Sequence, residues 1–107
     1  MRLLLDESVP RPLKRELPVH DVSTFVEMGW SGKRNSELLR LVVAGGFDAF
    51  LTVDQNLPFQ QNLRAAGIAV ILLIAHTNRL SELRPLVPEL RGALERVTSG
   101  DFVRIGA

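Results

Sequence analysis

Cysteine is absent from the 107 residues of this chain. This absence excludes a disulfide framework, a thiolate zinc site and a cysteine nucleophile, and it fits an expected cytoplasmic location. Histidine is scarce as well, because His20 and His76 are the only two and their spacing matches no histidine motif for binding a metal. Any metal site would therefore have to be built mainly from oxygen ligands.

The sequence also lacks a long apolar run and a large net charge. Its longest apolar stretch, Ile68 to Ala75, is far too short to cross a bilayer, which takes about 20 residues. The formal net charge is +1, so any basic surface that binds nucleic acid must be local. No charged leader with a cleavage site precedes the first strand-like run. We expect a soluble cytoplasmic protein without membrane contact.

Short apolar runs alternate with segments of helical spacing along the chain. A helix is expected after the first run, capped by Ser8, and another is expected through Ala44, capped by Asn35 or Ser36. This alternation predicts a three-layer α/β/α domain over residues 1–107, with a mainly parallel sheet of about four to five strands. The expected strands cover residues 2–5, 20–24, 47–53, 68–74 and 102–105, and further helices are expected over 57–66 and 83–97.

Acidic residues close two of the expected strands. Asp6 and Glu7 follow the first apolar run, and Asp54 follows the run from 47 to 53. If these runs are neighbouring parallel strands, their carboxylates meet at the edge where open α/β sheets place their sites. Close carboxylates repel one another, so such a cluster usually holds a divalent cation. The alternative role of each acid is that of a turn residue or a helix cap.

Further polar residues accompany these acids. Thr52 and Asn56 flank Asp54 with small oxygen-bearing side chains, which can ligate a hard cation or orient its water. Glu37 stands in the first turn of an expected helix, where it complements the helix dipole or, if that turn faces the same edge, joins the acidic cluster. His20 could act as a general base, although a histidine at the start of a strand is more often structural.

Basic residues and one tryptophan offer contacts to nucleic acid, but each has an ordinary alternative. Trp30, in a glycine-rich loop, can stack on a base or anchor the loop on the core. Two basic groups can line a phosphate-binding rim around the acidic centre or form solvated helix faces. The first group is Arg11, Lys14 and Arg15, and the second is Lys33, Arg34 and Arg40.

Taken in order, three segments resemble the PIN-like nucleases that are predicted as toxins of toxin–antitoxin modules. The segments are MRLLLDESVP, HDVSTFVEMGWSGKRNSELLRL and FDAFLTVDQNLPFQQNL, and together they cover nearly the whole chain. The resemblance implies a PIN-like fold and a metal-dependent ribonuclease that hydrolyses RNA phosphodiester bonds with Mg²⁺ or Mn²⁺. By the same resemblance, Asp6, Glu37 and Asp54 are the catalytic metal ligands.

The resemblance implies further roles and partners. Glu7 and Asn56 would be additional metal ligands, and Thr52, Asn56 and Ser36 would orient ligands or water. Relatives often carry an acid where Ser36 or Asn56 stands in this chain. An RNA strand is the expected substrate, an antitoxin protein the expected partner, and PIN-type domains commonly form homodimers. Contacts to the RNA backbone would come from Arg11, Lys33 and Arg34.

Two other functions stay open from the residues. The chain could be a non-catalytic PIN-like module that works through protein–protein contact. It also resembles a phospho-acceptor receiver domain, in which Asp54 would accept a phosphoryl group while Asp6 and Glu7 would bind Mg²⁺. Receiver domains resemble one another in a late lysine that contacts the phosphoryl group, and this chain has no lysine after Lys33.

Overall fold

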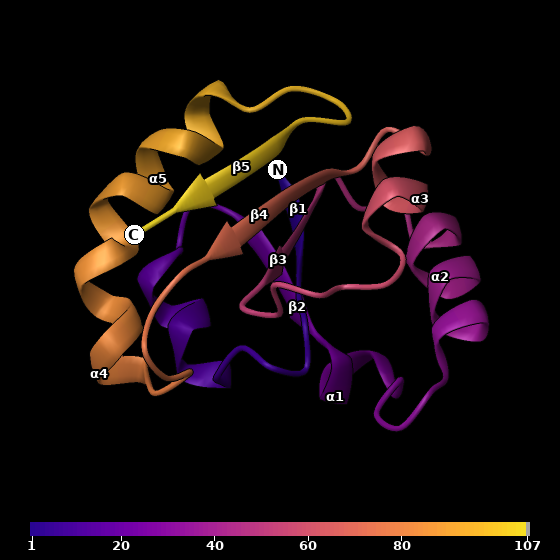
Figure 1. Ribbon diagram of the computed structural model, residues 1–107, viewed down its shortest axis with the longest axis horizontal. Coiled ribbons are helices and arrows are strands. Elements are labelled where there is room, and N and C mark those ends of the chain that lie inside the picture. Colours follow the sequence, from indigo (N-terminus) through magenta and orange to yellow (C-terminus); the bar gives the residue numbers. More distant parts are fainter. Residues whose placement is uncertain (107) are drawn as a thin grey trace.

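A five-stranded, all-parallel sheet forms the centre of the computed structural model, which describes residues 1–106. Helices cover both faces of the sheet (Figure 1), so the predicted three-layer α/β/α architecture is confirmed. The strands lie in the order β2-β1-β3-β4-β5. Their bounds are β1 (Arg2–Leu5), β2 (Asp21–Thr24), β3 (Ala49–Thr52), β4 (Ala69–Leu73) and β5 (Phe102–Ile105).

Two groups of helices pack on the two faces. One face is covered by the 3₁₀ helix η1 (Arg11–Glu16), α4 (Leu80–Leu83), the 3₁₀ turn η2 (Arg84–Leu86) and α5 (Val87–Arg96). The other face is covered by α1 (Phe25–Met28), α2 (Asn35–Ala44) and α3 (Gln60–Ala65). Each face therefore has its own hydrophobic core.

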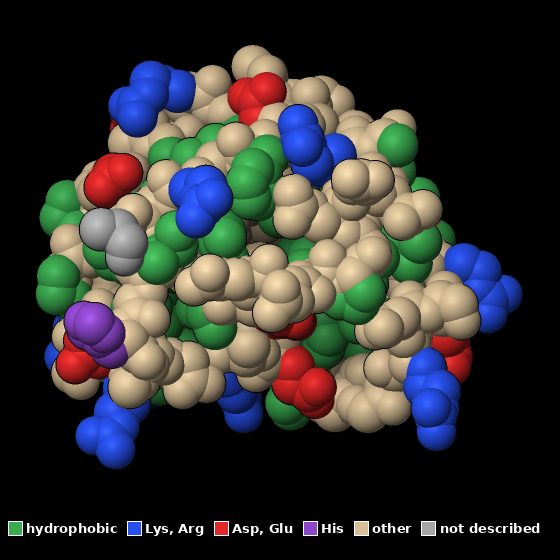
Figure 2. All heavy atoms as spheres, in the orientation of Figure 1, with side chains coloured by type: hydrophobic (Ala, Val, Ile, Leu, Met, Phe, Trp, Pro, Cys, Tyr) green, Lys and Arg blue, Asp and Glu red, His purple; other side chains and the backbone are tan. Residues whose placement is uncertain are grey.

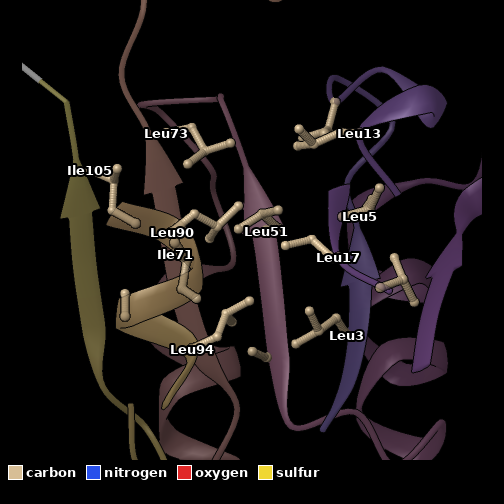
Figure 3. Packing of buried hydrophobic residues seen from close by; sticks show 14 of the residues in the cluster. Leu3, Leu5, Leu13, Leu17, Leu51, Ile71, Leu73, Leu90, Leu94 and Ile105 are labelled. Atoms are coloured by element: carbon tan, nitrogen blue, oxygen red, sulfur yellow. The ribbon is translucent and has the colours of Figure 1, made fainter. Parts of the chain in front are cut away.

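The alternation of side chains along the strands builds these two cores. Leu3 and Leu5 of β1 point to the face of η1 and α5, and Leu4 points to the face of α2 and α3. A parallel strand buried on both faces is apolar throughout, which explains the continuous runs in the sequence. Figure 3 shows the first core, where β1, β3 and β4 meet the helical layer. Its labelled members are Leu3, Leu5, Leu13, Leu17, Leu51, Ile71, Leu73, Leu90, Leu94 and Ile105.

Aromatic rings fill the second core. The Phe50 ring is fully buried, and its centroid lies 6.3 Å from that of Phe25 and 5.9 Å from that of Phe59. Trp30 extends this cluster, with its ring centroid 6.4 Å from Phe25 and 6.1 Å from Phe47. These edge-on contacts anchor the glycine-rich loop on the core. Of the two roles considered for Trp30, this is the alternative to stacking on a base.

The predicted helix capped by Ser8 is wrong. The segment forms the 3₁₀ helix η1 instead, and Pro10 stands at its N-cap position. Leu13 N donates to the Pro10 carbonyl at 3.0 Å, a three-residue step in place of the four-residue step of an α-helix. Pro10 and Pro12 each lack an N–H donor, so this segment has fewer backbone donors for a regular α-helix. Ser8 is thereby left free for a different contact.

Two other helix starts also differ from the prediction. Neither Asn35 nor Ser36 caps α2, because Arg34 holds the N-cap position and no side chain completes the cap. The helix α3 starts at Gln60 and not at Leu57, since a residue before a proline avoids the helical region and Pro58 follows Leu57. The side chains of Leu57 and Phe59 are buried in the resulting turn.

The surface mixes both signs of charge. On the face shown in Figure 2, Lys and Arg side chains are scattered around the outline and over the upper middle of the face, with acidic side chains between them. This distribution agrees with the formal net charge of +1. Within residues 1–106, no helix has the length and apolar character that a membrane crossing requires.

Candidate functional site

The ends of β1 and β3 form a topological switch point. From β1 the chain goes to β2 on one side, and it later returns to β3 on the other side, as the order β2-β1-β3-β4-β5 requires. In such sheets, ligands bind outside the carboxyl ends of the two strands where the order reverses. Leu5 pairs with Leu51 in the ladder, so Asp6 emerges beside the last residue of β3, Thr52. The condition stated for these two strands, that they are parallel neighbours, is met.

Asp6 is held by both its backbone and its side chain. Its N–H donates to the Leu51 carbonyl at 2.8 Å, and its own carbonyl accepts from Val9 N at 2.9 Å. Its Oδ2 accepts two hydroxyl hydrogen bonds, from Ser8 at 2.5 Å and from Thr52 at 3.0 Å. In residues 1–106 no donor bonds to Oδ1, so this oxygen is available to a ligand.

Thr52 links the two strand-end acids. Its hydroxyl is buried, donates to Asp6 and accepts from Asp54 N at 3.0 Å. Asp54 is exposed, and its Oδ1 accepts from Asn56 N at 2.9 Å, which fixes the turn after β3. The role of Thr52 as an orienting group for a metal ligand stays a prediction. Asn56 contributes here through its backbone N–H.

Two residues of this network were not among the predicted site residues. Ser8 donates to Asp6, and its carbonyl accepts from Asn78 Nδ2 at 3.0 Å. Asn78 lies in the loop after β4, so this bond ties a third strand end to the same edge. The spacing of Ser8 two residues after Asp6 is a signal for a local side-chain bond. Nothing local in the sequence indicates Asn78, which lies 70 positions from Ser8.

Glu37 lies at the same edge but in a different contact. The helix α2 ends just before β3 begins, so its first turn lies toward the carboxyl edge. There the Glu37 carboxylate pairs with Lys33 Nζ at 3.2 Å, and both side chains are substantially exposed. Within the described part of the chain, no three acidic or histidine side chains lie close enough together to hold a metal ion. A ligand role for Glu37 stays a prediction.

The remaining predicted residues are on the surface. Glu7 is exposed beside Asp6, and Arg34 and Ser36 are exposed at the start of α2. Their predicted roles are untested by these contacts. His20 lies just before β2, at the opposite edge of the sheet, which separates it from Asp6 and Asp54.

The donor chemistry of the strand ends fits a hard divalent cation. Asp6 Oδ1 and Asp54 Oδ2 are carboxylate oxygens that no hydrogen bond from residues 1–106 occupies. Mg²⁺ is commonly bound by one or two carboxylates while it keeps several waters. Asp6 and Asp54 are therefore the residues that would hold Mg²⁺ or Mn²⁺.

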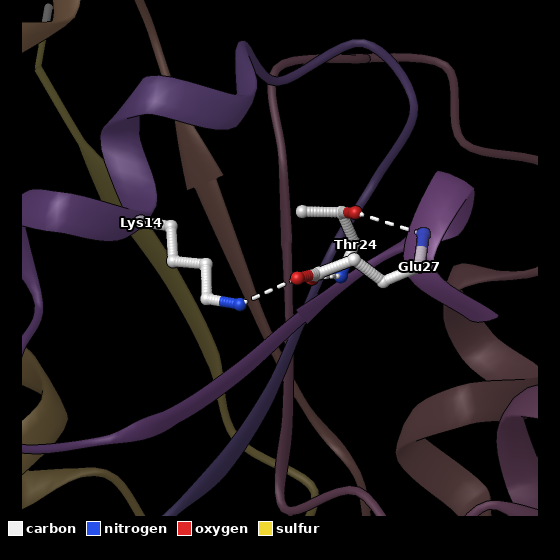
Figure 4. Close-up of polar contacts among 3 residues, drawn as sticks. All are labelled: Lys14, Thr24 and Glu27. Carbon is white, nitrogen blue, oxygen red and sulfur yellow. Dashed lines mark hydrogen bonds and ion pairs between the residues drawn. The ribbon is translucent and has the colours of Figure 1, made fainter.

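A groove of about 420 Å³ lies beside this site, lined by residues of η1, β2 and α1. Across it Lys14 Nζ pairs with Glu27 Oε2 at 2.7 Å (Figure 4). Glu27 also belongs to a capping box, in which its carboxylate accepts from Thr24 N and its N–H donates to the Thr24 hydroxyl. The groove residues are Arg11, Pro12, Lys14, Arg15, Thr24 and Glu27.

This ion pair makes a small, pH-dependent contribution to stability. The hydrogen bond from Lys14 is the main cause that lowers the pKa of Glu27 below its ordinary 4.5, against the opposing effect of burial. A lowered pKa stabilises the fold above pH 4.5, and this stability is lost as the pH falls through the folded pKa. We expect Glu27→Gln to cost at most about 1 kcal/mol at neutral pH. Urea melts should show this cost shrinking in acid, and a cost independent of pH would contradict the assignment.

Replacement of Thr52 tests the link between the acids. Thr52→Val keeps the shape but removes one donor to Asp6 and the acceptor of Asp54 N. We expect a loss of about 1–3 kcal/mol of unfolding free energy, because buried polar groups lose partners. Urea denaturation measures it, with Thr77→Val on the exposed loop after β4 as the matched control. The Thr77 hydroxyl accepts from Arg79 N at 3.2 Å in the same local way, so equal midpoints for the two variants would show that the burial of Thr52 and its bond to Asp6 contribute nothing.

Comparisons with models of known families, with curated proteins and with solved structures give no match for this chain. The PIN-like resemblance therefore stays a prediction from the residues themselves.

Proposed function

We propose that this chain is a metal-dependent ribonuclease of the PIN-like kind, with Asp6 and Asp54 as ligands of Mg²⁺ or Mn²⁺. Glu37 would complete the set by leaving Lys33, since an exposed ion pair of this kind contributes little to stability. The observation that supports the proposal is the position of Asp6 and Asp54 at neighbouring strand ends of the switch point, where the buried Thr52 hydroxyl bonds to the Asp6 carboxylate and to the Asp54 backbone N–H.

The chemistry follows from how these side chains are held. Ser8 and Thr52 both donate to Asp6 Oδ2, which fixes the carboxylate and directs Oδ1 away from them. Partners of this kind orient a ligand and hold it for the cation. When bound, a divalent cation supplies a water of lowered pKa and neutralises charge on the reacting phosphate. Asp54 is exposed just after β3, where a substrate can approach.

The substrate and partner follow from the resemblance of the sequence. RNA is the proposed substrate, and hydrolysis of its phosphodiester bonds is the proposed reaction. An antitoxin is the proposed partner, and it would have to cover the carboxyl edge in order to inhibit. A homodimer is compatible with this arrangement, provided that it leaves the same edge accessible.

A cleavage assay tests the proposed function. Purified protein is mixed with labelled, mixed-sequence single-stranded RNA in the presence of Mn²⁺, of Mg²⁺ or of a chelator. The proposal predicts fragments with either cation and none with the chelator. Cleavage that persists in the chelator would identify a contaminating metal-independent nuclease. Absence of cleavage in all three conditions would contradict the nuclease. Metal binding without cleavage would then favour the receiver-type domain, and the loss of both would favour a non-catalytic interaction module.

A receiver-type phospho-acceptor is the second candidate, and the strand order favours it. The order β2-β1-β3-β4-β5 is a common doubly wound order, with an exposed Asp54 at the end of β3 beside Asp6. The absence of any lysine after Lys33 counts against it. Incubation with Mg²⁺ and a small phosphoryl donor tests this candidate. Addition of one phosphoryl group, detected by intact mass in the wild type and absent in Asp54→Asn, would support it over the nuclease.

A further inference from the structure

The basic groove defined above lies one strand away from the acidic pair. Thr24, at the end of β2, lines the groove and pairs in the ladder with Leu5, the residue before Asp6. Neighbouring strands lie about 4.8 Å apart, so the groove begins close to the proposed metal ligands. Because η1 and α1 pack on opposite faces of the sheet, the groove between them crosses its carboxyl edge.

The charge of this groove is not neutralised within the protein. Its three cations and one carboxylate leave a net charge of +2, which exceeds the +1 of the whole chain. In residues 1–106, no carboxylate forms an ion pair with Arg11 or Arg15, and both side chains are exposed. Glu16, the acid of η1, is engaged elsewhere, with Arg84 at 3.3 Å and Arg91 at 3.7 Å.

We propose that this groove binds the phosphate backbone of an RNA strand and leads it to Asp6, an inference that rests on the proposed ribonuclease function. Arg11 and Arg15 supply the charges that pair with phosphates, because guanidinium groups bind phosphate oxygens in a bidentate manner. The proposal thus adds Lys14 and Arg15 to Arg11 as residues that contact the RNA phosphate backbone. Lys14 and Lys33 are each paired with a glutamate, so their charges are partly used within the protein.

Glu27 acts in this proposal as a built-in competitor of the phosphate. Its carboxylate already occupies Lys14, so a backbone phosphate must displace it or bind beside it. Removal of this negative charge should strengthen RNA binding. Glu27→Gln is a suitable change because glutamine can still accept from Thr24 N and keep the capping box. A purely structural role of the Lys14–Glu27 pair predicts no such gain.

Binding of RNA without cleavage provides the test. Fluorescence anisotropy of a labelled, mixed-sequence single-stranded RNA is measured in EDTA over a series of salt concentrations. Arg11→Ala and Arg15→Ala should each weaken binding by roughly 3- to 10-fold and reduce the salt slope by about 0.7. Glu27→Gln should tighten binding by a similar factor. Arg104→Ala is the matched control, because Arg104 is exposed on β5, the opposite edge strand, and should change neither value.

The outcomes separate this inference from the proposed function. Losses for both arginine variants together with a gain for Glu27→Gln support the groove, even if the wild type cleaves no RNA. Arginine variants that behave like Arg104→Ala overturn the groove, and Mn²⁺-dependent cleavage by the same wild-type preparation would then leave the nuclease intact. A wild type that binds no RNA at low salt also overturns the inference.

Discussion

Asp54→Asn is expected to lower metal-dependent RNA cleavage by at least about 100-fold, because a ligand charge worth several kcal/mol is removed from the cation. The fold should persist, since an asparagine Oδ1 can still accept from Asn56 N. Initial rates with labelled RNA and Mn²⁺ measure the effect, and circular dichroism verifies the fold. Asp21→Asn is the matched control, because Asp21 is exposed at the start of β2 and loses the same charge.

A different result would reassign the site. Equal rates for Asp54→Asn and Asp21→Asn, both folded, would remove Asp54 from the chemistry. Loss of activity in both variants would indicate an effect of net charge on RNA binding. Only a loss confined to Asp54→Asn agrees with a ligand at the end of β3.

Phe50→Ala is expected to cost about 3–5 kcal/mol of unfolding free energy, as a large side chain is removed from a packed core. The Phe50 ring is fully buried on β3 and packs against Phe25 and Phe59. The cavity left behind would weaken the contact between the sheet and the layer of α1, α2 and α3. Urea denaturation measures the loss, and Val43→Ala on the exposed side of α2 should stay within about 0.5 kcal/mol of the wild type.

A small effect of Phe50→Ala would contradict the arrangement of the second core. In that case, the aromatic rings would not be the main contact between the sheet and these helices. The position of β3 in the sheet would then have to be established by other evidence. This matters for the site, because the same strand positions Thr52.

The strands were predictable because burial on both faces leaves a continuous apolar run. The run from 68 to 74 matches β4, Ala69–Leu73, whose five residues are all buried. The edge strand β5 also falls at the expected residues 102–105, although it is only partly buried and carries the exposed Arg104. The order of the strands was not predictable, since the apolar pattern is the same for any parallel arrangement. The helix starts were misjudged where prolines intervene, at Pro10 and at Pro58, because the spacing of apolar residues does not register how proline restricts its own backbone and that of the residue before it.

The candidate site was predictable in part. A polar residue at a strand end is visible in the sequence, and the Thr52 hydroxyl bonds both to the Asp6 carboxylate and to the Asp54 N–H. Asn78 could not be found, since its contact with Ser8 depends on how the loop after β4 folds back. The sequence also could not decide whether the Glu37 carboxylate approaches Asp6 and Asp54. Glu37 instead forms a local ion pair with Lys33, in which both side chains are exposed.

Calorimetric titration of Mn²⁺ into wild type, Asp6→Asn and Asp21→Asn tests the central claim that Asp6 and Asp54 form a metal site. We expect the wild type and Asp21→Asn to bind Mn²⁺ and Asp6→Asn to have lost this binding. Asp6→Asn retains a side-chain oxygen for the Ser8 and Thr52 hydroxyls, so its fold should be kept. Equal Mn²⁺ binding by all three proteins, or no Mn²⁺ binding by the wild type with RNA present, would contradict a metal site at Asp6 and Asp54.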